Sequence, residues 1–118
     1  MSNKAWCPLP WMSVNVRNNG DLRVCCNANV GFDQGLVKKE DGTIYNLGTD
    51  GIKDFRNADL MKDIRKAMLN GEFHESCIRC KRETEAGMQS RAHWERIIWE
   101  HHLTEEKSKD LTNNDGSI

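Results

Sequence analysis

Polar and apolar residues alternate in two short stretches near the N-terminus. The first, "WMSVNVR", runs from Trp11 to Arg17 with its two valines on one face, and the second, "DLRVCC", begins at Asp21. Alternation with a period of two is typical of a half-buried β-strand. The "NNG" between them is a strong turn signal, because Asn and Gly both tolerate positive φ. The pattern therefore predicts a β-hairpin with strands at about 11–17 and 21–26.

Residues 27–51 show no sustained periodicity. This stretch carries five glycines and scattered apolar residues. Frequent glycines without hydrophobic periodicity are typical of loops. We expect a long glycine-rich loop here, with at most a short strand at Thr43–Leu47.

A helical period follows the loop. Asn57 is a candidate N-cap, and the Asn70-Gly71 pair is a stop signal. The apolar residues between them fall on one helical face: Leu60, Met61, Ile64, Ala67 and Met68. One amphipathic helix is therefore predicted in this segment.

Two more helices are predicted beyond that stop. Ser76 is the candidate N-cap of "CIRCKRETEA", which ends near Gly87, and Ser90 is the candidate N-cap of "RAHWERIIWEHHL". The expected apolar face of the last helix consists of Trp94, Ile97, Ile98 and His101. The final segment, 104–118, is polar and weakly patterned, so we expect a disordered tail or linker there. The expected fold class is a small α+β domain over residues 1–103.

Composition and charge exclude several classes of function. The chain has 118 residues, 37% of them hydrophobic and 30% charged, with a net charge of −1. Such a balance gives no reason to expect a nucleic-acid or membrane partner. Since no apolar run reaches the length of a signal peptide or a membrane span, we expect a cytoplasmic protein.

Five cysteines in a reducing compartment indicate metal or cluster binding rather than disulfides, and their odd number agrees. Cys77 and Cys80 form a C-x-x-C at the start of a predicted helix, where the helix N-terminus favours a thiolate. Taken alone, this motif is also found in redox dithiols and as an incidental pair.

The predicted hairpin supplies a second pair of thiols. Its turn brings Cys7 near Cys25, so that Cys7, Cys25, Cys77 and Cys80 are four candidate ligands. Adjacent strand residues point to opposite faces, so Cys26 is an alternative to Cys25 rather than an addition. Thiolates alone leave open a [4Fe–4S] cluster or a Zn²⁺ ion, and free cysteines can also be small buried hydrophobes.

The spacing C-x12-G-x4-C, from Cys7 through Gly20 to Cys25, resembles the opening of the SPASM and shorter twitch domains, the auxiliary-cluster domains of radical SAM (S-adenosylmethionine) enzymes. The likeness continues through "NLGTDGIKDFRNADLMKDIRKAMLNGEFHESCIRCKRETEAGMQSRA" and covers roughly residues 5–95. It implies one [4Fe–4S] cluster, held by Cys7 and Cys25 from the hairpin and by Cys77 and Cys80 from the later motif. Full SPASM domains have further cysteines, and none follows Cys80, as in the single-cluster form.

One feature departs from radical SAM enzymes. Their catalytic cluster binds C-x3-C-x2-C, and Phe73 stands where the first cysteine would be needed before Cys77 and Cys80. We therefore expect no catalytic residue in this chain, and an auxiliary module that acts beside a radical SAM catalytic domain in cis or in trans. The competing hypothesis is a structural zinc module that serves as an interaction surface. A thioredoxin-like oxidoreductase fits poorly, because the βαβ context is missing.

The residues around the cysteines have less specific interpretations. His74 is a candidate ligand or sulfur hydrogen-bond donor, or simply a surface histidine. Trp6 and Trp11 flank the first cysteine and either shield a cluster from water or pack in the core.

Overall fold

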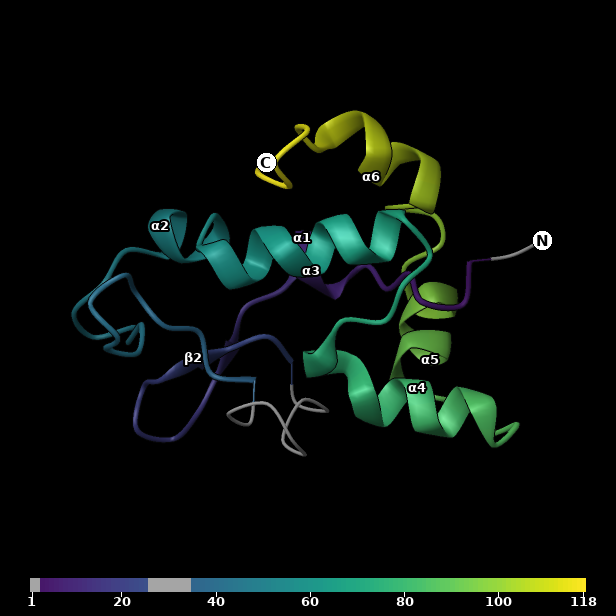
Figure 1. Cartoon of the computed structure of the whole chain (residues 1–118), viewed down its shortest axis with the longest axis horizontal. Helices are drawn as coiled ribbons and strands as arrows, with labels where there is room; N and C mark the ends of the chain where they lie inside the picture. The colour runs from purple at the N-terminus through teal and green to yellow at the C-terminus, as the bar shows by residue number, and fades with distance from the viewer. Residues whose placement is uncertain (1–2, 26–34) are drawn as a thin grey trace.

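The computed structural model describes residues 3–25 and 35–118. Figure 1 shows α3 across the middle of the molecule, α6 on one side of it, and the hairpin with α4 and α5 on the other. Within the described residues there are a two-stranded antiparallel sheet, six α-helices and a 3₁₀ turn. In chain order these are α1 Leu9–Met12, β1 Asn15–Val16, β2 Leu22–Arg23, α2 Ile52–Arg56, α3 Asp59–Leu69, the turn η2 Glu75–Cys77, α4 Ile78–Glu85, α5 Arg91–Ile98 and α6 Glu105–Leu111. The expected α+β class is confirmed.

The hairpin is present, but its strands are shorter than predicted. Asn15 pairs with Arg23 and Val16 with Leu22, and the turn contains Gly20 at φ +92°. Residues 11–12 belong to helix α1, because the N–H groups of Trp11 and Met12 both donate to the carbonyl of Pro8. Proline fits a first helical turn, where its missing N–H is not needed. Strand alternation therefore begins only after this short helix.

The glycine-rich loop runs alongside β2. The N–H of Leu22 donates to the carbonyl of Tyr45 at 2.8 Å, and the N–H of Val37 donates to the carbonyl of Leu22 at 3.1 Å. The predicted strand at Thr43–Leu47 is reduced to isolated bridges at Ile44 and Asn46. From residue 35 onward, the described part of the loop thus extends the pairing of the hairpin through isolated bridges rather than a third strand.

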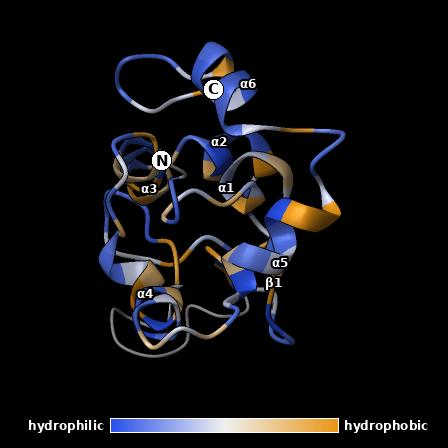
Figure 2. Ribbon diagram, turned by 90° about the vertical axis from the view of Figure 1, so that its right-hand side faces the viewer, coloured by the Kyte–Doolittle hydropathy of each residue, from blue (hydrophilic) through white to orange (hydrophobic). Residues whose placement is uncertain are grey.

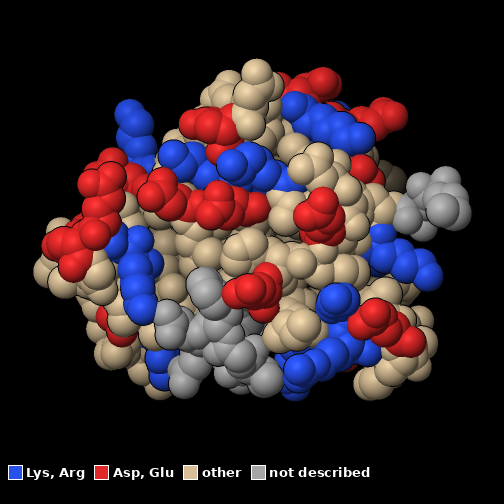
Figure 3. Space-filling model, in the orientation of Figure 1, with Lys and Arg blue, Asp and Glu red and all other residues tan. Residues whose placement is uncertain are grey.

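Helix α3 forms the centre of the core. Met61, Ile64 and Met68 are buried as predicted, while its solvent side carries the ion pairs Lys62–Asp59 and Lys66–Asp63. Figure 3 shows acidic and basic side chains mixed in a band across the middle of this face of the molecule. Asn57 is not the N-cap of this helix. It ends α2, and its side-chain amide both donates to and accepts from the backbone of Ile118, at 2.9 Å each.

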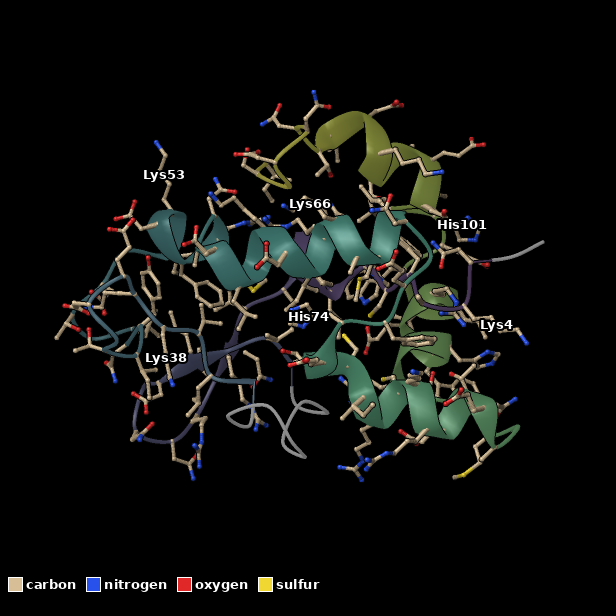
Figure 4. All side chains as sticks on the ribbon, in the orientation of Figure 1. Lys4, Lys38, Lys53, Lys66, His74 and His101 are labelled. Carbon is tan, nitrogen blue, oxygen red and sulfur yellow. The ribbon has the colours of Figure 1, made fainter. Side chains whose placement is uncertain are left out.

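Of the two N-caps predicted for the later helices, Ser76 and Ser90, only Ser90 is confirmed. Ser90 does cap α5, since its hydroxyl accepts from the N–H of His93 at 3.2 Å. Ser76 is not the cap of α4, whose N-cap residue is Cys77. Ser76 lies in the turn η2, which His74 caps through its ring nitrogen Nδ1, the acceptor of the N–H of Ser76 at 3.0 Å. His74 is half-buried beside η2 (Figure 4), and burial lowers the pKa of its ring.

The predicted apolar face of α5 is wrong. Trp94, Ile97 and Ile98 are 48%, 47% and 60% exposed, and the buried residues of this helix are Ala92 and Glu95. Figure 2 shows the apolar end of α5 facing outward. The helix also ends at Ile98, and His101 lies beyond it.

The segment after residue 103 does not form the expected disordered tail or linker. Thr104 caps α6 by accepting from the N–H of Lys107, and the following residues return to the core. The indole N–H of Trp6 donates to the hydroxyl of Ser108 at 3.0 Å, and that of Trp11 donates to the hydroxyl of Thr112 at 2.8 Å. The buried rings of Trp6 and Trp11 lie 6.2 Å apart between centroids. These two tryptophans therefore pack in the core and fix α6 to the N-terminal segment.

We expect Ser108→Ala to lower the free energy of unfolding by about 1–3 kcal/mol, because it leaves the buried indole N–H of Trp6 without an acceptor. Urea unfolding followed by tryptophan fluorescence measures the change. In a double-mutant cycle with Trp6→Phe, the two losses should add up to more than the loss in the double variant. Strict additivity would show that this hydrogen bond contributes nothing.

Candidate metal centre

Four thiols from three separate segments line one cavity. Cys7 precedes α1, Cys25 follows β2, Cys77 ends η2 as the N-cap residue of α4, and Cys80 lies in the first turn of α4. Cys7 and Cys80 are buried and the other two are partly buried. The hairpin and the C-x-x-C helix, 52 or more residues apart in the chain, therefore meet at this place.

The remaining walls of the cavity are almost entirely apolar. They are formed by Ala5, Leu9, Pro10, Val24, Met68, Phe73 and Ala92, together with Ser76 and Arg91. The enclosed space is about 20 Å³, close to the room that one water molecule needs. A larger occupant must therefore move these walls apart.

The four thiols surround this cavity without converging on one point. Across residues 3–25 and 35–118, no three His, Cys, Asp or Glu side chains are close enough together to hold a single metal ion. Charge on one of the four cysteines nevertheless affects the thiol pKa of another. The pKa of the Cys7 thiol is raised by burial first and then by charge at Cys25, Cys77 and Cys80.

Burial also raises the pKa of Cys77, to about 12, with smaller contributions from charge at Cys25 and Cys80. A raised thiol pKa means that the neutral S–H form is favoured at neutral pH. A cation in the cavity would reverse this preference, since coordination deprotonates a thiol outright. The site thus suits thiolates only together with a positively charged occupant.

Two groups favour negative charge at this site. The backbone N–H of Leu9 hydrogen-bonds to Cys7 and lowers the pKa of its thiol, although less than burial raises it. Arg96 of α5 donates to the carbonyls of Trp6 at 2.8 Å and Lys4 at 3.2 Å. Figure 4 shows Lys4 beside α5. Burial lowers the pKa of Arg96, and negative charge at Cys7 and Cys80 would raise it, so Arg96 is close enough to these two cysteines to favour their thiolates.

The unpaired hydroxyl of Ser76 indicates that the occupant of the cavity accepts hydrogen bonds. Ser76 is 3% exposed, lines the cavity, and is the one residue among those described whose buried side-chain polar atom has no partner. Buried polar groups are rarely left unpaired in native proteins. Four soft thiol donors, an apolar wall and an unpaired hydroxyl together fit an iron–sulfur cluster, whose sulfurs accept hydrogen bonds.

The sequence-based ligand set comes together in space, apart from one residue that lies outside the described part. Cys7, Cys25, Cys77 and Cys80 all reach the cavity, whereas Cys26, the alternative to Cys25, is in the stretch 26–34 that the structure does not describe. His74 is not among the residues that line the cavity. Sequence reasoning missed Ser76 and Arg96, which look like a helix cap and a surface charge.

Comparison with known families gives one match. A family model described as SPASM, an iron–sulfur cluster-binding domain, matches residues 7–81. Its span begins at Cys7 and ends one residue after Cys80, so it includes all four candidate ligands. No curated protein and no solved structure matches the chain. Within the described residues, no helix is long and apolar enough to cross a membrane.

Proposed function

The chain belongs to the SPASM family of iron–sulfur cluster-binding domains, and from that premise we propose that Cys7, Cys25, Cys77 and Cys80 hold one [4Fe–4S] cluster. The observation that carries this assignment is the meeting of four thiols from three segments at one cavity. Four thiolates match the usual ligand set of such a cluster, with one cysteine at each iron.

The residues of the chain define what the bound cluster does. With a cysteine at every iron, no iron keeps an open position for a substrate. When bound, the cluster supplies one-electron redox chemistry. Leu9 donates its N–H to Cys7, Arg96 places a positive charge near Cys7 and Cys80, and the apolar wall excludes water. This arrangement favours electron transfer or structural support over substrate binding.

The partner we propose is a radical SAM catalytic domain, in the same polypeptide or in a separate one. The support for it is the resemblance of the cysteine and glycine spacing to auxiliary-cluster domains of such enzymes. We place the protein in the cytoplasm, where thiols stay reduced and available for a cluster.

We expect protein purified without oxygen to be brown and to absorb near ~400 nm, as thiolate–iron centres do. Iron and acid-labile sulfide should each amount to about four per chain, as for one [4Fe–4S] cluster. Colourless protein with one tightly bound zinc per chain would instead establish the structural zinc module and refute the cluster.

A further inference from the structure

Ser76 is buried in a way that the rest of the fold does not explain. Its hydroxyl has no hydrogen-bond partner, although the residue is only 3% exposed. The other buried serines are satisfied, since Ser90 accepts from the N–H of His93 and Ser108 accepts from Trp6 and donates to the carbonyl of Glu105. An unsatisfied buried hydroxyl costs about 1–3 kcal/mol. A feature with this cost requires a reason.

The position of Ser76 supplies the reason. Ser76 lies in η2 immediately before Cys77 and lines the same cavity as the four thiols. Its N–H already donates to Nδ1 of His74, which fixes the turn and leaves the side-chain hydroxyl without a partner. Among the other side chains around the cavity, a thiol sulfur is a weak acceptor, and the hydrocarbon groups and the Arg91 guanidinium accept no hydrogen bond. A strong acceptor for the hydroxyl must therefore come from the occupant.

We propose that the Ser76 hydroxyl donates a hydrogen bond to a sulfur of the bound cluster, either a thiolate or an inorganic sulfide, and raises the reduction potential of the cluster. This inference rests on the proposed function, because it needs a cluster in the cavity. A hydrogen bond to sulfur stabilises negative charge. Uptake of one electron from a reductant adds one negative charge to the cluster and its thiolates without breaking a bond. The donor therefore stabilises the reduced form more than the oxidised form.

The experiment is a redox titration of cluster-loaded wild type and Ser76→Ala with dithionite, followed by electron paramagnetic resonance. We expect the equilibrium constant for reduction to fall about tenfold in the variant, which is a shift of ~59 mV to more negative potential. Ser108→Ala is the matched control, because it also removes a buried serine hydroxyl but does not line the cavity. Its potential should equal that of the wild type. Ser76→Thr keeps a hydroxyl and should restore the wild-type potential.

A spectroscopic measurement identifies the donor itself. In reduced protein exchanged into D₂O, electron–nuclear double resonance should detect an exchangeable deuteron coupled to the cluster that is lost in Ser76→Ala and retained in Ser76→Thr. A merely structural role for Ser76 would not produce this loss.

The possible outcomes distinguish the role of Ser76 from the proposed function. Loaded Ser76→Ala that titrates at the wild-type potential, or keeps the coupled deuteron, overturns the role of Ser76 and leaves the proposed function intact. Wild-type protein that takes up no iron overturns both. If Ser76→Ala folds but takes up no iron, the pair Ser76→Thr and Ser76→Val decides. Iron bound only by the threonine variant supports the hydroxyl, and iron bound by both or by neither overturns it.

Discussion

Replacing Cys7 with serine is expected to remove nearly all iron from the protein. Cys7 is buried and lines the cavity together with three thiols from other segments. Serine differs from cysteine by one atom but is a hard oxygen donor, whereas iron–sulfur clusters are held by thiolates. We expect bound iron to fall from about four atoms per chain to well under one, measured after anaerobic reconstitution and desalting.

Two further variants make the Cys7 result specific. If Cys77 and Cys80 acted alone as a redox dithiol, Cys7→Ser would leave their chemistry unchanged, and the four-cysteine site would be rejected. Cys25→Ser should lose iron as Cys7→Ser does, since Cys25 lines the cavity. Cys26→Ser is the matched control and should keep its iron. Loss of iron with Cys26→Ser alone would move the fourth ligand from Cys25 to Cys26.

The second large effect is expected at Arg65. This residue is 0% exposed, and its guanidinium donates to the carbonyls of Pro10 at 3.0 Å and Gly116 at 3.1 Å, and also to that of Arg56. Burial lowers its pKa to about 10, so it remains charged at neutral pH. Arg65→Ala leaves three carbonyls without this donor and opens a cavity. We expect a loss of about 3–5 kcal/mol in the free energy of unfolding.

Urea unfolding of wild type and variants tests the role of Arg65. Arg17→Ala, on the exposed turn of the hairpin, is the control and should change stability by about 0.5 kcal/mol or less. Arg65→Lys keeps the charge but cannot reach three carbonyls at once, so its loss should be intermediate. If Arg65→Ala were as mild as Arg17→Ala, these hydrogen bonds would contribute little to the stability of the fold.

Local signals in the sequence predicted several elements well. Three of these elements depend only on residues that are close together in the sequence. They are the turn at Gly20, the apolar face of α3 and the Ser90 cap. The approach of Cys7 to Cys25 depends on helix α1 as well as on the hairpin, because this helix lies between Cys7 and β1. The later C-x-x-C could be placed at the same site only through the resemblance to the family, because nothing local connects Cys77 to the hairpin.

Long-range contacts account for what the sequence could not predict. Arg65 looks like a solvent-exposed charge in "KDIRK", but carbonyls from Pro10, Arg56 and Gly116 surround it. Asn57 looks like a helix cap, and the distant backbone of Ile118 binds it instead. The final segment is polar in composition, yet the hydroxyls of Ser108 and Thr112 are the acceptors that two buried indoles need. Composition alone does not show which polar groups meet such partners.

The contact between Trp6 and Ser108 also sets an order of events during synthesis. The two residues are 102 positions apart, so the ribosome makes the partner of Trp6 only after nearly the whole domain has been translated. At 5–20 residues per second, the delay is about 5–20 s. During this time Trp6, the neighbour of Cys7, lacks the acceptor that its buried indole N–H has in the folded protein. All four cysteines that line the cavity are therefore translated well before the residue that fixes Trp6 beside Cys7.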